Sequence, residues 1–350
     1  MKKQSRIQAH HLHFAHGWIW GVVAVLLGLL VYAGIAKGYF HYWFGEEFRI
    51  VNAHEVVQSE NEAEKLEDVM RKTGVKTTVL VGMPSEALYY TGEQGFTGYK
   101  ENNEAILEVQ KENPVQFEAF CTLDPSDPNV MDVVQWCVEK GTKGFKLYSG
   151  HTFFYDKDLP LNDEKLDPMY SYFEFNQLPL IFHVNTGEYL SEFEDVLTEF
   201  PDMTVVCPHF CLSSKNLQRL SYLFDHYPKL YVDLSWGDEP LLVEGFTRIS
   251  EDPEKYREFI TKYADRFLFG TDTVVTDYEG KDEAWLTNLF TLYRDLLEKE
   301  ETTIFYEESG TVYKTLHLDY PVLEKIYETN WKKVMGESEE SLIQAFLLKF

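Results

Sequence analysis

Basic residues are scarce in this sequence. There are 32 lysines and arginines against 58 aspartates and glutamates, which gives a formal net charge of −26 over 350 residues. A nucleic-acid partner requires a basic patch, so this balance argues against one. Cysteines are also few, only four, which is no disulfide framework for so long a chain, and we expect them to be buried thiols. No glycine-rich phosphate loop follows any apolar run, so the main signal for nucleotide binding is missing.

Charge is missing altogether from residues 17–36, GWIWGVVAVLLGLLVYAGIA. Twenty such residues can cross a bilayer as a helix, and aromatic residues at both edges are typical of a membrane interface. Because basic residues precede the segment, we expect a cytoplasmic N-terminal segment (1–16), one transmembrane helix (17–36), a lipid bilayer as partner, and an extracytoplasmic main domain. A cleaved signal peptide is the alternative, since residues 34–36 read Gly-Ile-Ala, a small-x-small site.

The rest of the chain alternates short apolar runs with longer amphipathic ones. The amphipathic stretches have the apolar spacing of helices with one buried face, for example AEKLEDVMRKTG at 63–74. The apolar runs are rich in valine, isoleucine, leucine and phenylalanine, as buried strands are. They are FRIVNAH (48–54), KTTVLVGM (76–83), VQFEAFCTL (115–123), KGFKLYS (143–149), LPLIFHV (178–184), MTVVCPHF (203–210), KLYVDLS (229–235) and RFLFGTD (266–272).

Eight strand–helix units favour the α/β class and, within it, a (β/α)8 TIM barrel over residues 48–336. A doubly wound open sheet is the alternative topology. Residues 337–350 are expected to form a short C-terminal tail.

Polar side chains stand at the ends of several predicted strands. In a TIM barrel the reactive residues lie at the carboxyl ends of the strands, so these ends nominate the site. They are Asn52, His54, Lys146, Tyr148, His183, His209, Asp233, Ser235 and Asp272. Three histidines and an aspartate at equivalent ends predict an active site better than any one of them alone.

These segments also resemble a known family. GFKLYSG, LPLIFHVNTGE, VVCPHF, LYVDLS and RFLFGTD, in this order and spacing, are similar to the amidohydrolase superfamily. They most resemble the amidohydrolase-related branch that includes aminocarboxymuconate-semialdehyde decarboxylase-like enzymes. The closing HLDYPVLEKIYETNWKKVMG is similar to the terminal helices of that branch.

The resemblance implies a divalent metal, usually zinc, held by a strand-one His-x-His pair, a strand-five histidine and a strand-eight aspartate. The corresponding residues here are Asn52, His54, His183 and Asp272. Asn52 departs from the pattern, because an amide oxygen is a poorer zinc ligand than imidazole. Three protein ligands and a water suffice for a catalytic zinc, so the remaining three residues still supply enough ligands.

The resemblance also implies catalytic roles for His209, Asp272 and Lys146. His209 acts on the substrate or the water, and Asp272 accepts the water's proton. Lys146 occupies a position that some members carboxylate to bridge two metals, but a second metal is not assumed. The leading hypothesis is a membrane-anchored, metal-dependent hydrolase of a C–N or C–O bond in a small molecule, with carboxylates among the candidate substrates. A carboxy-lyase using the same site, and a catalytically silent barrel kept as a binding module, are the alternatives.

Overall fold

The computed structural model describes residues 48–337 apart from 58–59, 89–92, 94 and 277. Eight parallel strands form one sheet in sequence order, from β1 to β8. They are β1 (Ile50–Val56), β2 (Val75–Val81), β3 (Phe117–Thr122), β4 (Gly144–Gly150), β5 (Leu180–Val184), β6 (Val205–Cys207), β7 (Leu230–Asp233) and β8 (Phe267–Leu268). Each lies in or overlaps one of the eight predicted apolar runs.

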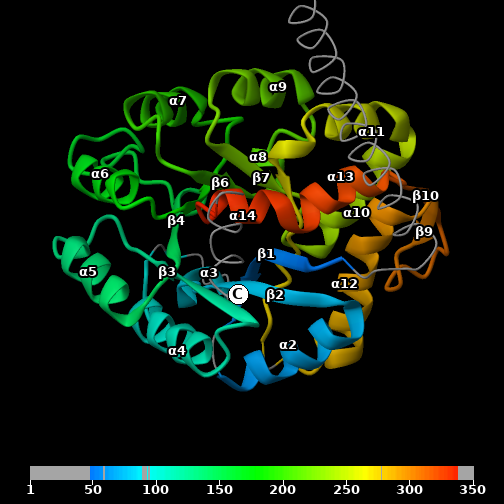
Figure 1. Ribbon diagram of the computed structural model, residues 1–350, viewed down its shortest axis with the longest axis horizontal. Helices are drawn as coiled ribbons and strands as arrows, with labels where there is room; N and C mark the ends of the chain where they lie inside the picture. Colours follow the sequence, from blue (N-terminus) through cyan, green and yellow to red (C-terminus); the bar gives the residue numbers. More distant parts are fainter. Residues whose placement is uncertain (1–47, 58–59, 89–92, 94, 277, 338–350) are drawn as a thin grey trace, which may run out of the picture. The chain divides into compact units, whose positions relative to one another are not determined.

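The first and last strands meet, so the sheet curls into a nearly closed barrel rather than an open sheet (Figure 1). The segment after β8 supplies the contact: the Ala53 N–H donates to the Phe269 carbonyl at 2.8 Å, and the Asp272 N–H donates to the His54 carbonyl at 2.9 Å. The predicted (β/α)8 barrel is therefore confirmed at the level of a nearly closed, eight-stranded parallel barrel. These contacts also bring the ends of β1 and β8 together.

Helical segments surround the barrel, and the longer, amphipathic ones bury their apolar faces against the outside of the sheet (Figure 1). They are α2 (Glu60–Thr73), α3 (Ser85–Leu88), α4 (Tyr99–Glu112), α5 (Val130–Lys140), α6 (Asp167–Phe175), α7 (Leu190–Glu199), α8 (Pro208–Cys211), α9 (Leu217–His226), α10 (Glu239–Glu251), α11 (Pro253–Lys262), α12 (Glu283–Glu298), α13 (Tyr320–Glu324) and α14 (Asn330–Val334). A short 3-10 helix, η1 (Ala264–Arg266), precedes β8, and a π-helical turn, η2 (Lys325–Thr329), joins α13 to α14. A small hairpin of β9 (Glu301–Thr303) and β10 (Val312–Lys314) follows α12.

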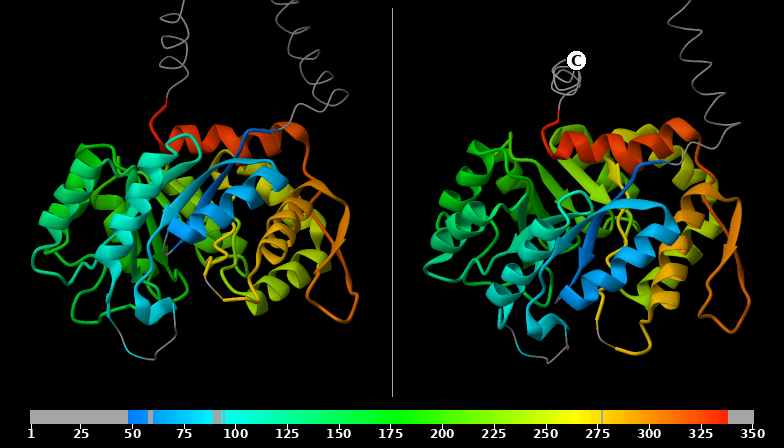
Figure 2. Two further views of the ribbon diagram at one scale, coloured as in Figure 1. Left: turned by 90° about the horizontal axis from the view of Figure 1, so that it is seen from below. Right: turned by 60° about the horizontal axis from the view of Figure 1, so that its bottom comes forward.

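The terminal helices cover one end of the barrel (Figure 2). The Trp331 side chain packs with Val51 and Phe120 in the apolar cluster that fills the barrel interior. The Asn330 amide donates to the carbonyls of Ala264 and Phe267 at 2.7 and 2.8 Å, where β8 begins. This end of the barrel is therefore plugged, and the reactive groups lie toward the carboxyl ends of the strands.

The four cysteines form two disulfides, which corrects the expectation of buried free thiols. Cys121 on β3 pairs with Cys137 on α5, and Cys207 at the end of β6 pairs with Cys211 four residues later. All four side chains are fully buried. A list of cysteine positions does not reveal pairing, because pairing depends on which Cα atoms the fold brings within about 4.4–6.8 Å.

The prediction of a single-pass membrane protein is contradicted. Within residues 48–337, as far as they are described, no helix has both the length and the apolar character that a bilayer crossing requires. The predicted span 17–36, the segment 1–16 and the tail from 338 onward lie outside the described residues.

Candidate functional site

The end of β1 carries a β-bulge. Asn52 pairs with Thr78 and Glu55 with Leu80, so β1 has one residue more than β2 over this stretch. The extra residue breaks the strict alternation of side chains along the strand. Asn52 and His54 therefore do not act as a pair on one face, although they are two residues apart.

Both polar atoms of the Asn52 side chain are hydrogen-bonded to the segment that follows β8. Its amide nitrogen donates to the Thr271 hydroxyl at 2.7 Å, and its amide oxygen accepts the Thr271 N–H at 3.1 Å. The geometry does not support Asn52 as a metal ligand. The residue that follows His54 by two positions, Val56, belongs to the apolar cluster inside the barrel. We infer that Val56, rather than Asn52, stands where a second strand-one imidazole would have to be.

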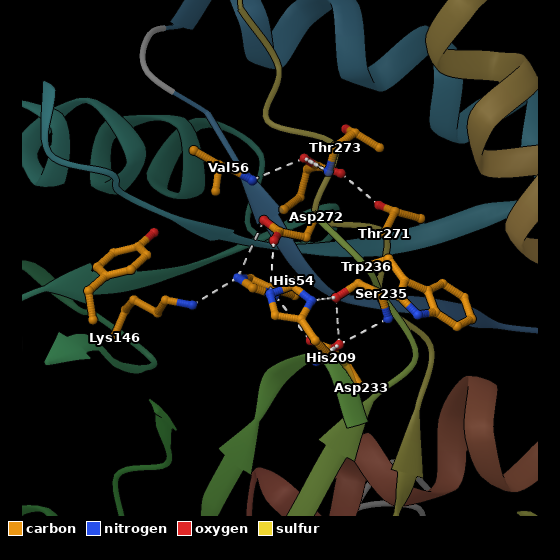
Figure 3. Close-up of polar contacts among 12 residues, drawn as sticks. His54, Val56, Lys146, His209, Asp233, Ser235, Trp236, Thr271, Asp272 and Thr273 are labelled. Carbon is orange, nitrogen blue, oxygen red and sulfur yellow. Dashed lines mark hydrogen bonds and ion pairs between the residues drawn. The ribbon is translucent and has the colours of Figure 1, made fainter. Parts of the chain in front are cut away.

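His54 is held from both sides (Figure 3). Its Nδ1 lies 3.0 Å from Asp233 Oδ2, and its Nε2 lies 3.0 Å from the Lys146 ammonium nitrogen. A carboxylate can only accept, so Nδ1 carries the proton and Nε2 presents its lone pair. His54 therefore donates a hydrogen bond to Asp233 through Nδ1, and the lone pair on its Nε2 faces a cation, the Lys146 ammonium.

His209 leaves β6 on an unusual turn. The backbone from His209 to Leu212 has φ values of 59, 55, 54 and 49°. The left-handed region costs an L-residue roughly 1–2 kcal/mol, so four such residues in succession need support from their surroundings. Part of that support is the His209 N–H, which donates to Asp233 Oδ1 at 2.9 Å.

The ring of His209 is fixed by a relay from Asp233. The Ser235 hydroxyl donates to Asp233 Oδ1 at 2.6 Å and lies 2.9 Å from His209 Nδ1. Because the hydroxyl proton goes to the carboxylate, the serine oxygen accepts from His209, and Nδ1 carries the proton. His209 therefore also presents a bare Nε2. Asp233 and Ser235, at the end of β7, thus orient both imidazoles, as the carboxylate–histidine pairs of metal sites do.

Asp272 stands opposite both lone pairs (Figure 3). Its Oδ1 lies 3.6 Å from His54 Nε2, and its Oδ2 lies 3.4 Å from His209 Nε2. Oδ1 is buried and has no hydrogen-bond partner among the described residues. Lone pairs of imidazole and carboxylate facing one another repel unless a cation lies between them. Lys146 supplies a cation beside His54 alone.

Glu55 points away from this cluster into the wall between β1 and the strand-eight segment. It accepts the Thr271 hydroxyl at 2.6 Å and the N–H groups of Thr273 and Val56 at 2.9 and 3.0 Å. Burial raises the pKa of Glu55 to about 7, although these hydrogen bonds lower it and only the charge of Asp272 adds to the rise. Glu55 thereby fixes the residues on either side of Asp272, through the Thr271 hydroxyl and the Thr273 N–H.

Burial sets the charge state of the surrounding bases. It lowers the pKa of Lys146 to about 8, although Asp272 and Asp233 oppose the shift, so the ammonium form still predominates at pH 7. It lowers the pKa of His209, and it places the pKa of His183 well below the usual range with the help of neighbouring positive charges. Neutral imidazoles are the form that binds metal ions.

Asp233 is kept ionised. Burial alone would raise its pKa, but the hydrogen bond and charge of His54, with His209 and Ser235, hold the pKa of this carboxyl well below its ordinary value. A permanent carboxylate at this position keeps the proton of each imidazole on Nδ1.

The cluster opens into a cavity of about 390 Å³. His54, Lys146, His183, His209 and Asp272 all contribute to its wall. The remaining wall is a mixture of aromatic and polar side chains from the loops after the strands, among them Tyr148, His151, Phe153, Trp236, Asp238, Glu244 and Arg248. A pocket of this size at the carboxyl ends of the strands suits a small organic molecule.

His183, the predicted strand-five ligand, also lines the cavity, but it lies beside His209 rather than beside Asp272. Its ring centroid lies 4.9 Å from that of His209 and 4.5 Å from that of His151, and no ion pair joins it to Asp272 among the described residues. The structure thus gathers His54, His209 and Asp272 most closely, with Lys146 beside His54 and His183 beside His209.

His151 was not among the residues that the predicted strand ends nominated. It follows β4 directly and turns into the cavity. The Phe153 N–H donates to its Nδ1 at 3.1 Å, so the neutral ring carries its proton on Nε2. Burial lowers the pKa of His151 to about 4, with a further contribution from His209 and Lys146. Its position just beyond a strand end was the available signal.

The donor set fits a divalent metal, although no three His, Cys, Asp or Glu side chains of the described part of the chain are already gathered around one point at binding distance. Around a tetrahedral zinc, with bonds of about 2.0–2.1 Å, neighbouring ligand atoms are about 3.3 Å apart. The separations of 3.6 and 3.4 Å from Asp272 to the two Nε2 atoms are close to that spacing. Two imidazole nitrogens with lone pairs, of which that of His54 also lies 3.0 Å from the Lys146 ammonium, and an unpartnered carboxylate oxygen are donors of the kind that zinc binds.

Comparison with known proteins agrees with this geometry. The family model described as amidohydrolase matches residues 10–332 of this chain. The chain belongs to the amidohydrolase family. The resemblance drawn from the strand-end motifs, to the amidohydrolase-related branch of the superfamily, is confirmed. No curated protein sequence matches the chain significantly.

Several solved structures share the family's barrel. An uncharacterised TIM-barrel protein of Bordetella bronchiseptica is 17% identical, with a TM-score of 0.55 over 82% of this chain and 98% of that one. A probable 2-pyrone-4,6-dicarboxylic acid hydrolase of Acinetobacter baumannii, with citric acid bound, is 13% identical, with a TM-score of 0.55 over 82% and 99%. The 5-carboxyvanillate decarboxylase of Sphingomonas paucimobilis is 12% identical, with a TM-score of 0.50 over 83% and 100%. At these identities the likeness shows the fold alone.

Proposed function

We propose that this amidohydrolase-family chain is a metal-dependent hydrolase of small molecules. The observation that carries the proposal is the pair of Nε2 lone pairs on His54 and His209 that face Asp272. Their tautomers are set by the carboxylate of Asp233, directly and through Ser235. We expect a divalent metal, most simply zinc, to be held by these two histidines and Asp272, with His183 available as a further ligand.

A bound divalent metal would supply Lewis-acid chemistry, polarising a carbonyl and acidifying water. The protein's own residues supply the proton transfers. Asp272 can accept the proton that an attacking water gives up, and the Lys146 ammonium can return a proton to the leaving oxygen or nitrogen. The Nε2–H of His151 can donate a hydrogen bond to the substrate in the cavity.

A carboxylate substrate suits the positive groups of the cavity. Lys146 is fully buried at its base, and Arg248 of α10 is 19% exposed at its wall, where it also contacts Glu244 at 2.9 Å and Ser214 at 3.0 Å. These cations favour a carboxy-lyase as the second candidate, because the same groups can hold a carboxylate that is lost as CO₂. The barrels of similar fold include a probable 2-pyrone-4,6-dicarboxylic acid hydrolase and a 5-carboxyvanillate decarboxylase.

The experiment is a turnover screen of the full chain with zinc, before and after treatment with a chelator. The panel holds lactones, esters and amides of small carboxylic acids, together with aromatic carboxylic acids for decarboxylation. We expect hydrolysis that chelation abolishes, that added zinc restores and that Asp272→Asn removes. Release of CO₂ without hydrolysis would favour the lyase, and chelator-resistant turnover would contradict the metal-dependent mechanism.

A further inference from the structure

The turn that carries His209 is closed by a covalent bond. The disulfide joins Cys207, the last residue of β6, to Cys211, so that it brackets Pro208, His209 and Phe210. The Cα atoms of the two cysteines are 4.9 Å apart. His209 is therefore the middle residue of a five-residue covalent ring.

The bracketed segment has a conformation that its residues do not favour by themselves. His209, Phe210 and Cys211 are all left-handed, and none of them is a glycine. An extended or right-handed backbone at these positions would carry the imidazole elsewhere, because side-chain direction follows φ and ψ. A short cross-link across the turn removes those alternatives.

Two backbone hydrogen bonds close the turn itself: the Leu212 N–H donates to the His209 carbonyl at 2.9 Å, and the Ser213 N–H donates to the Phe210 carbonyl at 3.0 Å. Other contacts reach the turn from neighbouring segments. The Thr186 hydroxyl donates to the Cys211 carbonyl at 2.5 Å, and Arg219 donates to the Leu212 carbonyl at 2.8 Å. On the other side, the His209 N–H is bound by Asp233. The disulfide adds a covalent link from the last residue of β6, across His209 and Phe210, to Cys211.

We propose that the Cys207–Cys211 disulfide is a positioning device of the site: it holds the left-handed turn that directs the Nε2 of His209 toward Asp272. The expected change in zinc affinity rests on the proposed function. The orientation of His209 itself does not, and it can be measured in the metal-free chain. Both sulfurs are fully buried, so the bond acts as a fixed constraint of the folded state.

The second disulfide provides a matched control. Cys121 and Cys137 are equally buried and link a strand to a helix, but neither lines the cavity. Removing this bond deletes the same chemistry without touching the His209 turn. A general loss of stability should therefore appear in both variants, and a loss of positioning in only one.

Three variants of the full chain make the test: Cys207→Ala/Cys211→Ala, Cys207→Ala/Cys211→Gly, and the control Cys121→Ala/Cys137→Ala. Glycine at position 211 adopts positive φ without a steric cost, so it relieves the turn without restoring the bond. Folding is checked by thermal unfolding. The tautomer of His209 is then read from ¹H–¹⁵N correlations of ¹⁵N-histidine-labelled, metal-free protein, assigned with His209→Gln, and zinc affinity is measured separately.

We expect the alanine pair to lose the pure Nδ1–H form of His209 and to bind zinc about tenfold more weakly. The glycine variant should recover part of both, and the control should match the wild type. A folded alanine pair with the wild-type tautomer and zinc affinity would overturn the proposal. So would failure of both 207/211 variants to fold while the control folds, since the bond would then serve folding. A wild type that binds no zinc refutes the proposed function, while the tautomer result still decides the role of the disulfide.

Discussion

Replacing Asp233 by asparagine probes how the two imidazoles are set. Oδ1 of Asp233 accepts three bonds, from the His209 N–H, the Ser235 N–H and the Ser235 hydroxyl, and Oδ2 accepts one, from His54. In Asp233→Asn the amide oxygen keeps the three-donor position, and the NH₂ group faces His54. An NH₂ group only donates, so His54 must accept at Nδ1 and move its proton to Nε2. The lone pair that would bind a metal is then lost.

The expected losses of stability and of zinc affinity follow from the contacts that Asp233→Asn keeps and the one that it removes. Three of the four hydrogen bonds and the side-chain volume survive, so the free energy of unfolding should fall by only about 1 kcal/mol. Loss of a carboxylate that orients a ligating histidine weakens metal affinity about 10–100-fold. That range corresponds to about 1.4–2.7 kcal/mol of binding free energy.

The assay is zinc competition with a chromophoric chelator at neutral pH, on the full chain. Asp265→Asn is the control, because Asp265 is 52% exposed and forms its ion pairs with Lys325 and Lys333 at the surface. We expect the control to match the wild type. A folded Asp233→Asn variant with unchanged zinc affinity would refute the tautomer argument.

Four further substitutions test residues around the site. The raised pKa of Glu55 means that the folded state loses stability as pH rises from 4.5 to about 7. The free energy of unfolding of Glu55→Gln, relative to that of the wild type, should therefore rise by about 2–3 kcal/mol between pH 5 and pH 8, as followed by thermal unfolding. A difference that does not change with pH would contradict this. Val56→His adds an imidazole two residues beyond His54 and should tighten zinc binding about tenfold, whereas Asn52→His should lower the melting temperature without tightening it. Lys146→Met removes the ammonium 3.0 Å from His54 Nε2 and should strengthen zinc binding at pH 7 several-fold by calorimetry, since two cations repel; weaker binding would count against it.

The barrel could be predicted because its signal is repeated. Eight apolar runs separated by amphipathic segments specify strands and covering helices, and polar residues near the ends of several runs mark the functional face. Lys146, His183, His209 and Asp272 were found in this way, and the structure places all of them around one cavity. The order of the ends along the chain was enough, because parallel strands bring their carboxyl ends to one side.

The finer geometry depended on features that no local pattern encodes. The bulge in β1 separates Asn52 from His54, and a strict two-residue alternation could not reveal it. The pairing of Cys207 with Cys211, and the left-handed turn that it spans, depend on the packing around Asp233. The closeness of His209 rather than His183 to Asp272 follows from that turn.

The most direct test of the central claim is the zinc stoichiometry of the purified full chain after equilibration with zinc and removal of the excess. We expect about one zinc per chain in the wild type and in Asp265→Asn. We expect loss of that zinc in His54→Ala and in Asp272→Asn, with each variant still folded by thermal unfolding. A folded wild type without bound zinc, or variants that keep it, would contradict the assignment of these residues to a metal site.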